Sequence, residues 1–165
     1  MRIGLIIVVA LAGSPALAAG GGDVVAPASL RLAASAQAAL DRGQPSVAID
    51  TFEAALAVDP KNERAFVGLG RVYASLGLPG RAIKYYREAL ALQPNDLVAL
   101  EDQGRALIAR GATERAKTNL ARIKTLCAAA DCPAARRLEI AIAAPAPLPA
   151  KTAAVEVPKP VTVKN

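Results

Sequence analysis

Small and large apolar residues alternate at helical spacing along residues 81–95, whose sequence is RAIKYYREALALQPN. Ala82, Tyr86 and Ala89 follow one another at intervals of four and three, which places them on one face of an α-helix. Pro94 stops the run, because proline removes a backbone donor and disfavours helix before it. The pattern predicts an amphipathic helix that packs through a face of mixed small and large side chains.

The same pattern returns at a spacing of 34 residues in both directions along the chain. Equivalent positions are Ala48, Ala82 and Ala116; Phe52, Tyr86 and Leu120; Gly43, Gly77 and Gly111; Ala36, Gly70 and Gly104; and Leu32, Phe66 and Leu100. A fixed period of this length predicts stacked units of two helices, in which no unit buries its own apolar face. Gly43, Gly77 and Gly111 suit the turn between paired helices, because the chain reverses there through a residue with positive φ.

This repeat resembles the tetratricopeptide repeat family, and the match is closest in residues 63–96. That unit has Phe66, Leu69, Gly70, Tyr73, Gly77, Ala82, Tyr86, Ala89 and Pro94 at the family's spacing. Residues 29–62 are a looser copy, with Ser35 at a usual leucine position, and residues 97–130 are a third that lacks the final proline. The resemblance implies an all-α fold, a short right-handed α-solenoid of about three helix pairs.

The chain after the repeats predicts a closing helix and then a tail. Within residues 131–143, Leu138 and Ile142 lie four apart and can cover the last repeat as a capping helix. Residues 144–165 are rich in proline and predict a disordered tail. Alternating valines near its end leave a second interpretation open, in which the tail adds to a sheet edge of a partner.

The first residues have the pattern of a secretory signal peptide. Residues 1–18 combine a basic start, an apolar run and a small-x-small motif that ends at Ala18. The ten apolar residues of 3–12 are fewer than the roughly 20 that span a membrane, although an uncleaved anchor is the alternative. We therefore expect cleavage near Ala18, export to a bacterial periplasm without a transmembrane anchor, and a flexible leader over residues 19–28.

The composition adds a net charge of +6, no histidine and only 3% aromatic residues. Because lysines and arginines form no block and do not interleave with aromatic residues, we expect no nucleic-acid partner. Without histidine, Ser–His and Cys–His mechanisms are excluded, and the sequence has no G-x-x-x-x-G-K phosphate loop. These observations predict a protein that is not an enzyme and that needs no cofactor and no metal.

The two cysteines, Cys127 and Cys132, favour a structural disulfide. A cysteine pair without histidine is a poor zinc site, because four ligands are usual, and export favours oxidation. Positions five apart on a continuous helix lie too far apart along the axis to bond, so the helix must break between them. A redox-active or free pair is the alternative.

The family resemblance implies a concave groove that is lined by the first helix of each unit. The positions that it assigns to the groove are Gln37, Leu40, Asp41, Arg64, Val67, Arg71, Ser75, Glu101, Arg105 and Ile108. Arg71 and Arg105 occupy equivalent places and predict a basic ladder for an acidic peptide or a C-terminal carboxylate. The alternative is that each is an ordinary solvated arginine.

The sequence therefore predicts protein–protein interaction, with two hypotheses for its form. In the first, the chain is an adaptor or scaffold of the bacterial cell envelope that holds a protein or peptide segment of unknown identity in its groove. In the second, it is a structural subunit of a larger envelope complex and docks through its convex face or its C-terminal tail. The family's chaperone-tail clamp is not expected here, because its lysine and asparagine places carry Ala33, Ala34, Val67 and Gly68.

Overall fold

The computed structural model describes residues 24–128 and 131–144 of the chain. The predicted signal peptide, most of the predicted leader and the predicted tail beyond Ala144 lie outside the described residues. The described part forms the helices α1 (Pro27–Asp41), α2 (Pro45–Val58), α3 (Glu63–Ser75), α4 (Pro79–Leu92), α5 (Leu97–Ala109), α6 (Thr113–Cys127) and α7 (Pro133–Ala143). None of these helices is long and apolar enough to cross a membrane.

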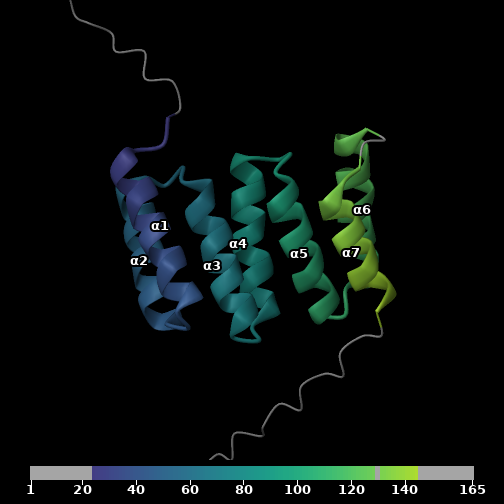
Figure 1. Cartoon of the computed structure of the whole chain (residues 1–165), viewed down its shortest axis with the longest axis horizontal. Helices are drawn as coiled ribbons and strands as arrows, with labels where there is room; N and C mark the ends of the chain where they lie inside the picture. Colours follow the sequence, from purple (N-terminus) through teal and green to yellow (C-terminus); the bar gives the residue numbers. More distant parts are fainter. Residues whose placement is uncertain (1–23, 129–130, 145–165) are drawn as a thin grey trace, which may run out of the picture.

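The helices are arranged as a row of hairpins. The helices α1, α3 and α5 each pack against the helix that follows, and the pairs α1–α2, α3–α4 and α5–α6 stack along the long axis of the molecule (Figure 1). The last helix, α7, packs on both α5 and α6 and covers that end of the row. The prediction of an all-α solenoid of helix pairs with a capping helix is confirmed.

Glycine and proline set the turn inside each helix pair. Gly43, Gly77 and Gly111 have φ of 71°, 70° and 82°, a conformation in which a Cβ is strained. Pro45 and Pro79 then begin α2 and α4, at the first helical position, where the missing N–H costs nothing because that donor has no partner inside the helix.

The alternation of small and large residues is a packing device between neighbouring helices. A Cβ on Gly68 would fall on the ring of Phe52, and a Cβ on Gly70 would fall on the ring of Tyr86. Phe52 and Tyr86 are 1% and 2% exposed, so these rings have no room to move away. Because Gly68 and Gly70 have no side chain, α2 and α4 can both approach α3 closely.

A buried polar cluster fixes the N-terminal end of the stack. The Ser29 hydroxyl donates to the carbonyl oxygen of Ala55 and accepts from Nδ2 of Asn62, both at 2.7 Å. The backbone N–H of Ala26 donates to the Asp59 carboxylate at 2.7 Å. These bonds tie the start of α1 to the α2–α3 connection. The first helix accordingly begins at Pro27, two residues before the predicted first repeat.

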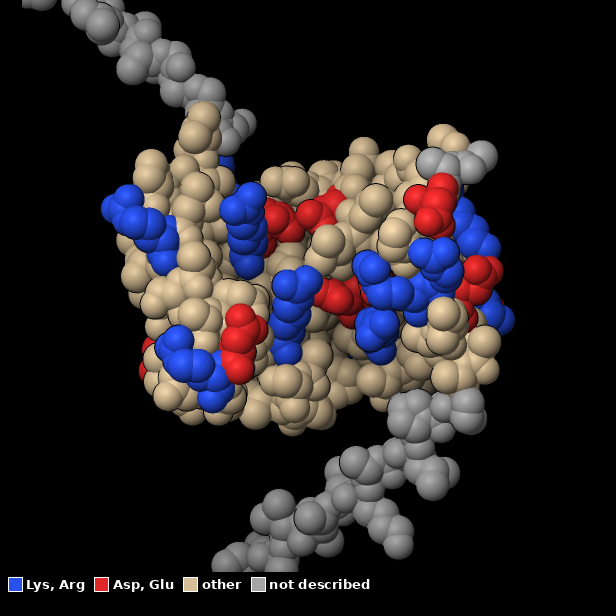
Figure 2. Space-filling view, viewed as in Figure 1, with Lys and Arg blue, Asp and Glu red and all other residues tan. Residues whose placement is uncertain are grey.

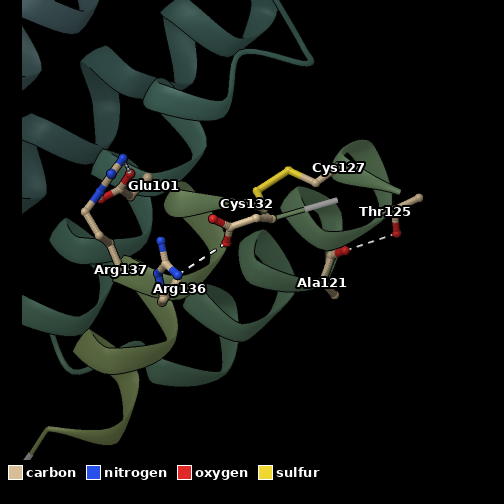
Figure 3. Close-up of a disulfide and its surroundings, with 8 residues drawn as sticks. Glu101, Ala121, Thr125, Cys127, Cys132, Arg136 and Arg137 are labelled. Carbon is tan, nitrogen blue, oxygen red and sulfur yellow. Dashed lines mark hydrogen bonds and ion pairs between the residues drawn. A yellow bond between two sulfur atoms is a disulfide. The ribbon is translucent and has the colours of Figure 1, made fainter. Parts of the chain in front are cut away.

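The C-terminal end is closed by a disulfide and an ion pair. The disulfide joins Cys127, the last residue of α6, to Cys132, which directly precedes α7, with their Cα atoms 6.0 Å apart (Figure 3). The chain is not helical between them at residues 131–132, as the pairing requires. Arg137 of α7 reaches Glu101 of α5 in the same region.

Candidate peptide-binding groove

A cavity of about 330 Å³ opens on the face formed by the odd-numbered helices. The first helix contributes Leu30, Ala33, Ala34 and Gln37, and the third contributes Glu63, Arg64, Val67 and Arg71. Phe52 of α2, with Asp96 and Val98 at the start of α5, completes the lining. The cavity thus combines an apolar lining with charged residues that come from α3 and from the start of α5.

The structure brings together only part of the groove that the sequence predicted. Gln37, Arg64, Val67 and Arg71 line this cavity. The remaining predicted positions, Leu40, Asp41, Ser75, Glu101, Arg105 and Ile108, lie outside it. Among these, Asp41 accepts a hydrogen bond from the Gln37 amide at 2.8 Å, so it orients a residue of the cavity from one turn away.

The two arginines of the expected basic ladder are both engaged by carboxylates of α5. Nε of Arg71 lies 2.7 Å from Oδ2 of Asp102, and Nε of Arg105 lies 3.4 Å from Oε1 of Glu101. Basic and acidic side chains accordingly alternate across this face and do not separate into patches (Figure 2). An acidic ligand at Arg71 would therefore have to compete with a carboxylate that already holds it.

Glu101 contributes to closing the stack. Its side chain is 7% exposed, and the Arg137 guanidinium binds it through Nε and Nη2, at 2.8 and 2.6 Å (Figure 3). The hydrogen bond and the charge of Glu101 raise the pKa of Arg137. Since α7 covers this carboxylate, Glu101 is not presented to a ligand in the groove.

Glu63, the first residue of α3, is the exceptional group in the cavity. It is 7% exposed, and no described residue donates a hydrogen bond to its Oε1. Burial raises its pKa to about 6, the charge of Asp96 adds to the rise, and Arg64 and Arg71 oppose it. The carboxylate is therefore mostly ionised at neutral pH, in surroundings that penalise its charge.

The sequence analysis missed the acidic half of this site. Glu63 and Asp96 lie at the start of α3 and just before α5, where the family resemblance assigns no ligand contact. The ion pairs Arg71–Asp102 and Arg137–Glu101 join positions that are not equivalent in the repeat. A usable signal was the position of Asp96 and Asn62 before a helix, typical of an N-cap. Each caps its helix, with acceptor-to-nitrogen distances of 2.7 Å to Ala99 and 3.3 Å to Ala65.

Comparison with known proteins gives a consistent picture of the fold. A family model described as "Tetratricopeptide repeat" matches residues 34–96, whereas no curated protein matches the sequence. The MamA protein superposes with a TM-score of 0.57 at 22% identity over 60% of this chain and 54% of MamA. The chain thus spans about half the length of MamA.

Two further solved structures contain bound peptides. The first TPR of Spaghetti (RPAP3), bound to the HSP90 peptide SRMEEVD, has a TM-score of 0.61 at 24% identity, covering 70% of this chain and 96% of its own. The Yersinia enterocolitica type III secretion chaperone SycD, in complex with a peptide of the translocator YopD, has a TM-score of 0.61 at 20% identity, covering 74% and 92%. At this level of identity the likeness concerns the fold.

The sequence repeat, the stacked helix pairs and the family match agree with one another. The matched residues run from within α1 to beyond the end of α4, and the α5–α6 pair continues the same stack. Residues 34–96 therefore match the tetratricopeptide repeat, and the rest of the described chain continues the same fold of stacked helix pairs.

Proposed function

We propose that this protein is a non-catalytic adaptor of the bacterial cell envelope, which binds a peptide or protein segment in the groove of its odd-numbered helices. The observation that carries this proposal is the cavity of about 330 Å³ between α1, α3 and the start of α5. Its volume lies in the range of ligand sites, and such sites combine an apolar wall with a few charged groups. Solenoids of helix pairs present their concave surface to extended ligands.

The solved relatives support a peptide as the ligand class. Spaghetti (RPAP3) holds a peptide of HSP90, and SycD holds a peptide of a translocator, in the same fold. The envelope location is an inference from the signal-like sequence of residues 1–18, and the disulfide is consistent with an oxidising compartment. The intact mass of the protein from cells should lack about the first 18 residues, and a full-length mass in the membrane fraction would contradict the export.

The groove can be tested by filling it. Ala34 is exposed on α1 and lines the cavity, so Ala34→Trp should occupy the ligand's place without disturbing the core. Ala54→Trp, on an exposed position of α2, is the matched control. With a partner identified by cross-linking in the native compartment and then purified, we expect Ala34→Trp to weaken binding by about tenfold or more.

Deletion of residues 145–165 separates the adaptor from a subunit that docks by its tail. The adaptor keeps its partner without the tail, and Ala54→Trp binds as the wild type does. Loss of the partner on deletion, together with normal binding by Ala34→Trp, would instead support the structural subunit. Thermal melts of each variant show whether a loss reflects unfolding.

A further inference from the structure

Two glutamates are buried in the described part of the chain, and they differ in how their charge is met. Glu101 is 5% exposed and receives two hydrogen bonds from Arg137. Glu63 is 7% exposed, and its Oε1 receives none from the described residues. A buried carboxylate oxygen without a donor is costly, and native proteins supply such groups with a partner. Glu63 is therefore suited to bind a cationic donor.

The charges around Glu63 leave it without a dedicated cation. On α3, Arg71 lines the same cavity but is held at 2.7 Å by Asp102 of α5. Arg64, also on α3, lines the cavity, as does Asp96, which precedes α5, and the charges of both act on Glu63. The helices α1 and α2 contribute only uncharged lining residues. The cavity therefore contains two carboxylates, Glu63 and Asp96, whereas one of its two arginines, Arg71, is already paired with α5.

The rest of the cavity is suited to the stem of a long side chain. Its apolar lining comes from four helices, with the small Ala33 and Ala34 on α1, Phe52 on α2, Val67 on α3 and Val98 on α5. Lysine and arginine lay their methylene stems along such apolar surfaces and present a charge at the tip. A basic side chain would bury its stem here and bring its donors to a carboxylate that needs them.

We propose that the cavity between α1, α3 and α5 receives a basic side chain of the partner peptide, with Glu63 and Asp96 binding its charged end. This inference rests on the proposed function and adds the chemistry of the ligand. It reverses the expectation of a basic ladder for acidic peptides. An acidic ligand would face Glu63 and Asp96, and would have to compete with Asp102 of α5 for Arg71.

The test uses the purified protein as it is isolated from cells and random peptides displayed on phage. Peptides selected at about pH 7.5 should carry lysine or arginine next to apolar residues. A selected peptide is then synthesised together with a twin in which its basic residue is replaced by norleucine, which keeps the stem and removes the charge. We expect the twin to bind at least about tenfold more weakly, as the loss of a charge-assisted hydrogen bond predicts.

Glu63→Gln keeps the shape of the side chain and removes its charge. The variant should bind the basic peptide about as weakly as the wild type binds the twin, and it should hardly distinguish the two peptides. Glu53→Gln, an exposed position of α2 outside the cavity, is the control and should leave both affinities unchanged. Lowering the pH from about 7.5 to about 5 protonates Glu63 and should weaken the basic peptide alone.

The outcomes separate this inference from the proposed function. If Ala34→Trp blocks the selected peptides but they are acidic or uncharged, or if Glu63→Gln binds them normally, the basic-side-chain inference is wrong and the groove remains. If Ala34→Trp blocks none of the selected peptides, the result contradicts both the basic-side-chain inference and the proposed binding groove. The norleucine twin and the pH series require no variant, so the inference stays testable even if Glu63→Gln fails to fold.

Discussion

Arg137 of the last helix donates two hydrogen bonds to Glu101 of α5, from Nε at 2.8 Å and from Nη2 at 2.6 Å. Because the planar guanidinium matches both carboxylate oxygens, the pair fixes distance and orientation together. Glu101 is 5% exposed and is further approached by Arg105 at 3.4 Å. The pair therefore anchors the capping helix to the first helix of the third repeat, at the C-terminal end of the stack.

Removing this arginine should loosen the cap. Arg137→Ala leaves the buried Glu101 carboxylate with the longer contact to Arg105, and an acceptor that loses its donor inside a protein is destabilising. Arg136→Ala is the matched control, because its partner Asp131 is exposed and such surface pairs contribute little. Urea unfolding should show a clear loss for Arg137→Ala and almost none for Arg136→Ala; equal losses would contradict the anchoring role.

The contact between Gly70 and Tyr86 gives a second prediction. In Gly70→Ala, the new Cβ meets the Tyr86 ring, which is 2% exposed. Overpacking costs about 1–3 kcal/mol, which exceeds the gain of about 1 kcal/mol from replacing glycine by alanine in a helix. The variant should therefore unfold at a lower urea concentration than the wild type.

Gly80→Ala is the control for this substitution. Its Cβ would meet the end of the Arg110 side chain, at Nη1, and that exposed residue can swing away. Only the helix-propensity gain then remains, so this variant should be as stable as the wild type or more stable. If both alanine variants were stabilising, the close approach of α4 to α3 would not depend on the missing side chain.

The period of 34 residues predicted the architecture because it reports on equivalent contacts. Gly43, Gly77 and Gly111 repeat since every helix pair needs the same reversal, and all three have positive φ. The small residues repeat for a similar reason, because each pair packs in the same way. Residues that pack within and between units therefore recur at a fixed spacing in the sequence.

The charges of the candidate site do not repeat, and so the period could not reveal them. Arg71 pairs with Asp102 across two units, at a separation of 31 residues that depends on how the solenoid stacks. Glu63 is buried in a cavity that it shares with residues of α1 and of the start of α5, an arrangement that no local pattern encodes. The sequence therefore identified four residues of the cavity but neither of its carboxylates, and the preference of the groove for an acidic or a basic ligand stays a prediction.

The disulfide between Cys127 and Cys132 should contribute to stability through the short loop that it closes. The chain-entropy model gives about 2 kcal/mol for a loop of this size. We expect both cysteines of the native protein to resist alkylation until a reductant is added, and reduction to lower the urea midpoint. The double variant Cys127→Ser, Cys132→Ser should not respond to reductant, and alkylation of the untreated protein at both sites would rule out the bond.

The last prediction concerns the pH dependence that Glu63 gives to folding. Its pKa rises from 4.5 to about 6 on folding, chiefly through burial and then through the charge of Asp96. The folded state therefore binds a proton more tightly than the unfolded state, and the stability that this group contributes is present below about pH 4.5 and is lost as the pH rises to about 6. The shift of about 1.5 units corresponds to about 2 kcal/mol.

Glu63→Gln removes this titration, so its stability relative to the wild type should increase by about 2 kcal/mol between pH values of about 4 and 7. Comparing the two proteins at each pH cancels other carboxylates, such as Asp59, whose pKa is lowered by hydrogen bonds from the backbone of Ala26 and Lys61. Glu53→Gln, at an exposed position of α2, is the control for the substitution itself. A Glu63→Gln curve that runs parallel to the wild type would show that the buried carboxylate already has a partner, and the case for a basic ligand would lose its ground.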